Sequence, residues 1–304
     1  MNPTPRQLET RRGIIFYPTY IPVTSFGEKY PLDKLIQPYL PRLAQAIMVS
    51  YHYAKQMREQ PRIPMMVDSG GFASLFENAK VAGSGNLGTL TIDYGDRQEK
   101  LHPKDILDLQ EQIAEVAFSL DFPIPPKMGL REAKKRQRLT IANAHWAITN
   151  RRRRDLKLFA CIQAWDVASA RDCARAYAGA PFDGIAIGGL VPRVRDKKLT
   201  LGIIEAVRNE VGNLPLHAFG LGNLEIIDQL FGAGVDSVDS SSYVKMAANG
   251  RLLSSPGAVK PDPSPTSRLH IALCNLAAAT GRTLPLSAVR MVFETHEIRS
   301  SSTK

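Results

Sequence analysis

The sequence is poor in cysteine, and its three cysteines cannot form a disulfide framework. Cys161, Cys173 and Cys274 lie far apart and are odd in number, which is typical of a reducing compartment. No CxxC or HxxxH spacing occurs in the chain, so a structural zinc site would have no obvious ligands. We therefore predict neither a metal site nor a cofactor.

Long apolar runs are also missing. No stretch reaches the ~18 apolar residues of a membrane-spanning helix, and only 44% of the residues are hydrophobic. The first residues, MNPTPRQLETRRG, are polar and contain no apolar segment of a signal peptide. The sequence therefore predicts a cytoplasmic protein with no membrane partner.

Positive charge, in contrast, is in excess. The chain has 39 Lys and Arg against 29 Asp and Glu, which gives a net charge of +10. A basic surface suits a polyanionic partner, because phosphate neutralisation supplies most of the non-specific affinity for nucleic acids. Charge alone leaves open the alternative of a basic surface with no partner.

Short β-rich runs alternate with amphipathic segments along most of the chain. Alternating strands and helices imply a parallel sheet, and eight repeats imply that the sheet closes into a barrel. The predicted fold class is therefore α/β, a (β/α)8 TIM barrel over residues 1–250. The eight runs cover residues 14–23, 46–54, 63–71, 115–122, 157–164, 182–190, 215–222 and 235–242.

Two regions interrupt this alternation. Residues 72–102 predict an insertion after the third strand, with a hairpin of its own. Residues 251–268 are rich in Pro and Ser and predict a linker. Residues 269–299 predict a C-terminal helical extension, two helices that pack on the barrel.

Polar residues follow the apolar part of several predicted strands. Active sites of such barrels lie at the C-terminal ends of the strands, so these residues are the candidates for chemistry. Each of them has an ordinary alternative role, such as a turn aspartate, a rim glutamine or a glycine turn without a ligand. The candidates are Asp68, Ser69, Asp121, Gln163, Gly188, Gly189 and Asp239.

The last strand contains two aspartates, of which one is expected to face the barrel mouth. Asp236 and Asp239 are three residues apart, so their side chains lie on opposite sides of a strand. We assign the mouth position to Asp239 and a structural role to Asp236. The basic run at 151–155 falls in a helix-to-strand connection, which predicts the opposite end of the barrel and no catalytic role.

Taken together, these motifs resemble the tRNA-guanine transglycosylase superfamily. The resemblance rests on the order and spacing of DSGGF, a strand-ending Asp, IQ, IGGL and GVDSVD, and it extends from about residue 13 to residue 299. It implies that Asp239 is the nucleophile that attacks C1′ and displaces guanine. It also implies that Asp68 is the acid/base that protonates the leaving base and deprotonates the incoming 7-deazaguanine.

The resemblance assigns the remaining site residues to recognition of the base. Asp121 would accept hydrogen bonds from the base, and Gln163 with the Gly189 N–H would hold its carbonyl oxygen. Ser69 would lie beside the base. The flanking positions Gly70, Gly188 and Leu190 complete the predicted binding set.

The chain departs from the tRNA enzymes in two places. Their zinc ligands would fall in residues 251–268, which contain no cysteine. Their arginines after the nucleophile align with YVKMAA, where Lys245 keeps one charge and Ala248 removes the other. These departures favour the DNA-acting paralogues, which insert 7-cyano-7-deazaguanine into DNA and belong to modification clusters with further partner proteins. Lys245 is then the candidate for contact with the nucleic acid.

Three other interpretations stay open. The first is exchange of guanine in tRNA. The second is a non-catalytic nucleic-acid-binding subunit, although such a subunit should lack the nucleophile that this chain retains at Asp239. The third is an unrelated barrel enzyme that binds a phosphorylated metabolite on the GIAIGG and FGLG turns, which would leave the pairing of Asp68 and Asp239 unexplained.

Overall fold

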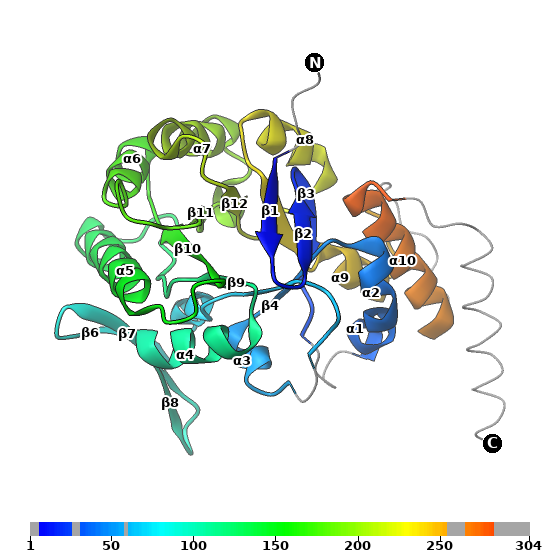
Figure 1. Cartoon of the computed structure of the whole chain (residues 1–304), viewed down its shortest axis with the longest axis horizontal. Coiled ribbons are helices and arrows are strands. Elements are labelled where there is room, and N and C mark those ends of the chain that lie inside the picture. The colour runs from blue at the N-terminus through cyan, green and yellow to red at the C-terminus, as the bar shows by residue number, and fades with distance from the viewer. Residues whose placement is uncertain (1–5, 26–30, 58–59, 254–264, 283–304) are drawn as a thin grey trace.

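Eight parallel strands form one continuous sheet in the computed structural model, which describes residues 6–25, 31–57, 60–253 and 265–282 (Figure 1). An isolated parallel bridge between Val23 and Met48 joins the two edge strands and closes the barrel. Each strand lies within one of the eight predicted runs, so the (β/α)8 prediction is confirmed. Around the barrel the strands are β3 (Thr19–Pro22), β13 (Ser237–Ser240), β12 (Leu216–Ala218), β11 (Gly184–Ile187), β10 (Lys157–Ile162), β9 (Val116–Phe118), β5 (Met65–Val67) and β4 (Ile47–Val49).

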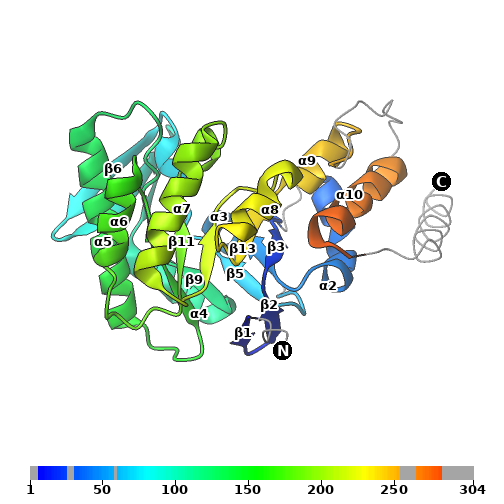
Figure 2. The same cartoon turned by 90° about the horizontal axis from the view of Figure 1, so that it is seen from above.

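Helices follow the strands in turn and cover the outside of the barrel. Asp166, Asp196 and Asn223 begin three of these helices by accepting a hydrogen bond from a backbone N–H in the first turn. Figures 1 and 2 show α5, α6 and α7 side by side. The helices up to residue 248 are α1 (Pro31–Ile36), η1 (Gln37–Tyr39), α2 (Leu40–Leu43), α3 (Tyr51–Ala54), η2 (Gly71–Leu75), α4 (Pro103–Ile113), α5 (Leu130–Asn150), α6 (Val167–Arg175), η3 (Val191–Arg193), α7 (Lys197–Val211), α8 (Leu224–Gly232) and α9 (Ser242–Ala248).

Side chains on the strands alternate between the barrel interior and the helix layer. On β10, Phe159 and Cys161 pack in the interior cluster, whereas Leu158 and Ala160 pack against the helices. This is the two-residue period of a strand whose two faces are both buried. The same period turns the residue that follows β10, Gln163, toward the axis of the barrel.

The first predicted run, 14–23, is not a single strand. It contains β2 (Gly13–Phe16), which pairs antiparallel with β1 (Gln7–Thr10), and then the barrel strand β3. Leu8 and Ile15 of this hairpin pack against the apolar interior of the barrel. The apolar residues of the run do not show which part belongs to the hairpin and which to the barrel, because β2 and β3 both bury side chains in the apolar interior of the barrel.

The predicted insertion, 72–102, forms three antiparallel strands rather than a hairpin. They are β6 (Ala79–Ser84), β7 (Leu87–Asp93) and β8 (Gln98–Leu101). Asn143 of α5 fixes the sheet, because its amide exchanges two hydrogen bonds with the backbone of Gly88. A Cβ at Gly88 would lie 2.3 Å from Phe122, so the close approach requires glycine.

The C-terminal extension packs on the barrel through α10 (Pro265–Thr280), which begins inside the predicted linker 251–268 rather than at 269. Leu269 and Leu276 join the main core, and Asn275 donates to the carbonyls of Tyr243 and Arg251. Figures 1 and 2 show α10 and the β6–β8 sheet at opposite ends of the molecule. Most of the linker and the second predicted helix, after residue 282, lie outside the described residues.

The basic run at 151–155 lies in the α5–β10 connection, at the N-terminal end of the strands. Arg151 pairs with Asp183, Arg152 with Glu111 at 2.9 Å, and Arg153 donates to backbone carbonyls near the end of α4. The run therefore lies at the end of the barrel opposite the mouth, as the sequence predicted, and Arg152 and Arg153 hold the C-terminal end of α4. In the described residues no helix is both long and apolar enough to cross a membrane.

Candidate active site

The two aspartates of the last strand have opposite positions, as predicted. Asp236 lies just before β13 and pairs with Arg208 at 2.7 Å and with Arg6 at 2.6 Å. Asp239 lies three residues on, at the C-terminal part of β13, and is 7% exposed. Asp236 is therefore structural, and Asp239 is the carboxylate at the barrel mouth.

One carboxylate oxygen of Asp239 is fixed and the other is free. Its Oδ1 lies 3.0 Å from Nε2 of His217 and accepts a hydrogen bond of 3.0 Å from the Gly220 N–H. His217 is fully buried on β12, and its Nδ1 lies 2.8 Å from the Ser237 hydroxyl. Among the described residues nothing bonds to Oδ2, which leaves that oxygen available to a ligand.

Asp68 has the same half-fixed arrangement at the end of β5. Its Oδ1 accepts from the backbone N–H groups of Gly70 at 2.8 Å and Tyr51 at 3.1 Å, and in the described structure Oδ2 has no hydrogen-bond partner. The pKa of Asp68 is raised to about 7, mainly by burial and also by the charges of Asp239 and Asp121, while the two N–H donors act to lower it. A carboxyl group with a pKa near neutrality can both donate and accept a proton.

Asp121 is the centre of a buried hydrogen-bond chain between two loops. Its Oδ1 accepts from the Ser69 hydroxyl at 2.8 Å, and its Oδ2 accepts from Nε2 of Gln163 at 2.6 Å. Burial raises the pKa of Asp121, while these two hydrogen bonds lower it. A carboxylate has about four lone-pair sites, so Asp121 can accept further hydrogen bonds from a ligand.

Gly188 and Gly189 lie directly against Gln163. A Cβ at Gly188 would lie 2.0 Å from Nε2 of Gln163, and Gly189 has φ +71°, which L side chains rarely adopt. Within the described part of the chain the Gly189 N–H donates to no protein atom, so it remains a possible donor to a ligand. Leu190, also predicted for this site, is 1% exposed and packs in the core.

Two buried arginines that the sequence did not single out hold the loop after β9. Arg136 donates to the carbonyl of Pro123 at 2.8 Å and to the Ser74 hydroxyl at 3.1 Å. Arg193 donates to the carbonyls of Ile124 at 2.9 Å and Gly189 at 2.6 Å. Asp121 thus belongs to a segment that is fixed from two sides, as a rigid recognition site requires.

His217 and Phe72 are two further residues of the site that the sequence analysis did not identify. His217 could have been found from strand pairing, because it stands opposite Ser237 in the register of β12 and β13 and so shares a face with Asp239. Phe72 is 67% exposed and follows the Asp68–Gly71 turn. An exposed aromatic ring at a barrel mouth is a candidate for stacking on a planar ligand.

Lys245 lies on α9, just after the strand of Asp239. Its side chain is exposed, and within the described residues it forms no ion pair. Ala248 is exposed at the end of the same helix. In the described residues no group of three or more His, Cys, Asp or Glu side chains could hold a metal ion.

Comparison with known proteins gives the relationship of this chain. The family model described as queuine tRNA-ribosyltransferase matches residues 7–283. A tRNA-guanine(15) transglycosylase of Methanothermobacter thermautotrophicus is 28% identical over 202 residues, which are 65% of this chain and 28% of the relative. One of Methanococcus aeolicus is 26% identical over 260 residues, 83% of this chain and 38% of the relative. A queuine tRNA-ribosyltransferase of Chlamydia caviae is 38% identical over 81 residues, 26% of this chain and 21% of the relative.

This chain thus spans between 21% and 38% of the length of these three relatives. The family match, in contrast, covers both carboxylates, the Asp121–Gln163 site and all of α10. It agrees with the resemblance that the motifs indicated. The chain belongs to the queuine tRNA-ribosyltransferase family.

Proposed function

We propose that this protein exchanges a guanine base in a nucleic acid for a 7-deazaguanine through a covalent intermediate on Asp239. The observation that carries the proposal is the pair of half-fixed carboxylates, Asp239 and Asp68, beside the buried Asp121–Gln163 recognition site. Double displacement at an anomeric carbon needs one charged carboxylate and one that can exchange a proton.

In the first step, Oδ2 of Asp239 attacks C1′ of the target nucleotide. The bond between C1′ and N9 breaks, its electron pair goes to the guanine, and Asp68 supplies the proton that neutralises the leaving base. The ribosyl or deoxyribosyl group is then an ester of Asp239. In the second step, Asp68 takes the N9 proton of the incoming base, N9 attacks C1′, and the carboxylate of Asp239 leaves.

The base would lie against Asp121, Gln163 and Gly189. Asp121 would accept from the N1–H and the exocyclic amine, while Gln163 and the Gly189 N–H would donate to the carbonyl oxygen. Ser69 and Gly70 hold the turn beside the base, and Gly188 allows the close approach to Gln163. Phe72 would stack on the exposed face of the base.

The named relatives support tRNA as the polymer, because their names describe tRNA-guanine transglycosylases and queuine tRNA-ribosyltransferases. They favour tRNA over the DNA substrate that the sequence analysis preferred. DNA is retained as the second candidate because residues 251–268 contain no cysteine and Ala248 stands where a tRNA enzyme would have an arginine. The 7-cyano substituent and any protein partners remain part of that second candidate.

Incubation with radiolabelled guanine tests the proposal and separates the polymers. We expect label to enter tRNA or duplex DNA with wild-type protein and neither polymer with the Asp239→Asn variant. Uptake into tRNA alone would select tRNA, and uptake into DNA alone would select DNA. Equal uptake by the wild type and the Asp239→Asn variant would contradict the proposed chemistry.

A further inference from the structure

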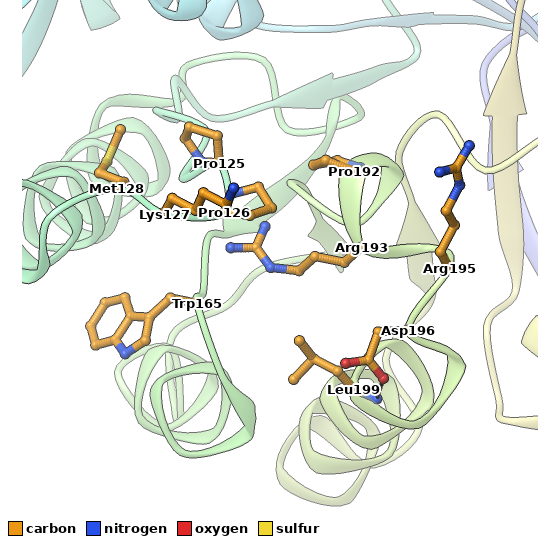
Figure 3. Close-up of a pocket in the computed structure, with 10 residues that line it drawn as sticks. All are labelled: Pro125, Pro126, Lys127, Met128, Trp165, Pro192, Arg193, Arg195, Asp196 and Leu199. Atoms are coloured by element: carbon orange, nitrogen blue, oxygen red, sulfur yellow. Dashed lines mark hydrogen bonds between the residues drawn. The ribbon is translucent and has the colours of Figure 1, made fainter.

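A groove of about 400 Å³ lies beside the base site on the same end of the barrel (Figure 3). It is lined by the segments that follow β9, β10 and β11, and by the start of α7. The mechanism proposed above uses none of its exposed side chains. The residues used in the following argument are Lys127, Trp165, Arg193, Arg195 and Asp196.

Arg193 is a buried cation that faces this groove. It is 6% exposed, and burial lowers its pKa. Only Nη1 is engaged, with the carbonyls of Ile124 and Gly189, and no acidic side chain pairs with it among the described residues. Its Nε and Nη2 lack a protein partner there without being sealed from solvent, and Figure 3 shows the guanidinium between Lys127 and Trp165.

A buried guanidinium without a carboxylate is costly unless an anion compensates for it. Lys127 and Arg195 are exposed at the same groove, and neither forms an ion pair within the described residues. The one carboxylate of the lining, Asp196, is engaged in capping α7 through the Leu199 N–H at 3.0 Å. The groove therefore presents three cations with unused donors.

Trp165 adds a flat apolar surface to this cationic groove. The indole is partly exposed and follows Gln163 by two residues, so it lies just outside the base site. An aromatic face beside cations is the combination that binds single-stranded nucleic acids, with bases stacked on the ring and phosphates against the charges. A free phosphate would use the cations but not the indole.

We propose that this groove binds a nucleotide of the substrate strand other than the exchanged one. Its phosphodiester lies against Arg193 and Lys127, a neighbouring phosphate of the strand lies toward Arg195, and its unpaired base stacks on Trp165. The inference rests on the proposed nucleic-acid substrate. Because Arg193 also holds the carbonyl of Gly189, occupation of the groove stabilises the base site next to it.

The tryptophans provide a direct readout of stacking, since the chain has only Trp146 and Trp165. In a Trp146→Phe variant, Trp165 is the only indole. A single-stranded oligonucleotide of about 12 nucleotides should quench its fluorescence, and the quenching should follow the binding isotherm measured by anisotropy. Quenching of the same strength and affinity by guanosine monophosphate would overturn the proposal in favour of a free phosphorylated metabolite.

The second arm measures affinity for the same oligonucleotide. The Lys127→Ala/Arg195→Ala double variant should bind about tenfold more weakly, and its slope of log affinity against log salt should be shallower by about one to two. Trp165→Leu should weaken binding about 5- to 150-fold, the range of one stacked base. Affinity for free guanine should not change in either variant.

Arg154→Ala is the matched control, because Arg154 is exposed in the α5–β10 connection at the other end of the barrel. It should leave affinity and salt dependence unchanged. Groove variants that bind like the wild type, or that bind no more weakly than Arg154→Ala, would overturn the proposal. Failure of the proposed function is distinguishable, since the wild type would then exchange no guanine in any polymer.

Discussion

The two carboxylates of the mouth have the same side chain but different surroundings. Asp68, at the end of β5, is held by two backbone N–H groups and has a pKa of about 7. Asp239, on β13, is held by one backbone N–H and by His217. Strands β3 and β4 separate their positions around the barrel.

In the proposed mechanism, this difference lets one residue type fill two roles. Each carboxylate keeps one oxygen free for chemistry, so its geometry alone does not show which is the proposed proton donor and which is the proposed nucleophile. The surroundings distinguish them, because the raised pKa of Asp68 suits a group that carries a proton near neutral pH. The imidazole beside Asp239 supplies a hydrogen-bond partner that a charged carboxylate can use.

Substitution of Asp239, the proposed nucleophile, should have the largest effect on base exchange. Asp239→Asn replaces the charged oxygen by an amide, which is a poor nucleophile, and we expect exchange to fall by about 10⁴-fold or more. Labelled-guanine uptake measures this decrease. Asp236→Asn, on the other side of the same strand, is the control and should keep exchange while lowering thermal stability.

Asp68→Asn should reduce exchange by about 10²- to 10⁴-fold, the usual contribution of a general acid or base. In the wild type, the protonated form of Asp68 decreases as pH rises above its pKa of about 7. The departure of guanine should therefore slow about tenfold per pH unit above that value. A flat pH profile for single-turnover release of guanine would contradict the role of Asp68 as the acid.

The same substitution should stabilise the folded protein at alkaline pH. Asp68 binds its proton more tightly in the folded state, with a pKa of about 7 against an ordinary value of 3.8. Its contribution is therefore fully favourable below about pH 4 and is lost as pH rises through about 7. Asp68→Asn should add about 1–3 kcal/mol to the free energy of unfolding at about pH 8. Denaturant titration should show no gain at about pH 4.

His217 should be a positioning residue, with a smaller effect than either carboxylate. His217→Phe removes the group that contacts Oδ1 of Asp239 while keeping an aromatic ring beside Phe118 and Phe219. We expect kcat to fall about tenfold, because the Gly220 N–H still holds the same oxygen. His217→Gln, which retains a donor, should recover most of the rate. A fall in affinity for guanine without a fall in kcat would assign His217 to binding instead.

Lys245→Ala should have the smallest effect and should act on the polymer alone. If Lys245 neutralises one phosphate, its removal should make the slope of log affinity against log salt shallower by about one. Affinity for free guanine, which carries no phosphate, should be unchanged. An unchanged salt slope would remove Lys245 from the nucleic-acid interface.

The sequence predicted the barrel and the positions of both carboxylates well, for a physical reason. Buried parallel strands leave continuous apolar runs, and the polar residue that ends each run marks the mouth, as Asp68, Asp121 and Gln163 show. The sequence analysis did not predict the third strand of the insertion or the separate hairpin β1–β2, because their alternation of apolar and polar residues resembles that of the neighbouring strands. His217 and Arg193 could not be recognised from local patterns, since His217 contacts Asp239, 22 positions away, and one of the contacts of Arg193 is with Ile124, 69 positions away.

The most direct test of the account is the location of the covalent bond. A guanine-containing nucleic acid should be mixed with enzyme in the absence of incoming base, denatured, digested with protease and analysed by mass spectrometry. The account predicts an ester between Asp239 and C1′ of a sugar that has lost its guanine, found on the peptide that contains Asp239, and no adduct in the Asp239→Asn variant. An adduct on Asp68, or full exchange with no adduct at any residue, would contradict it.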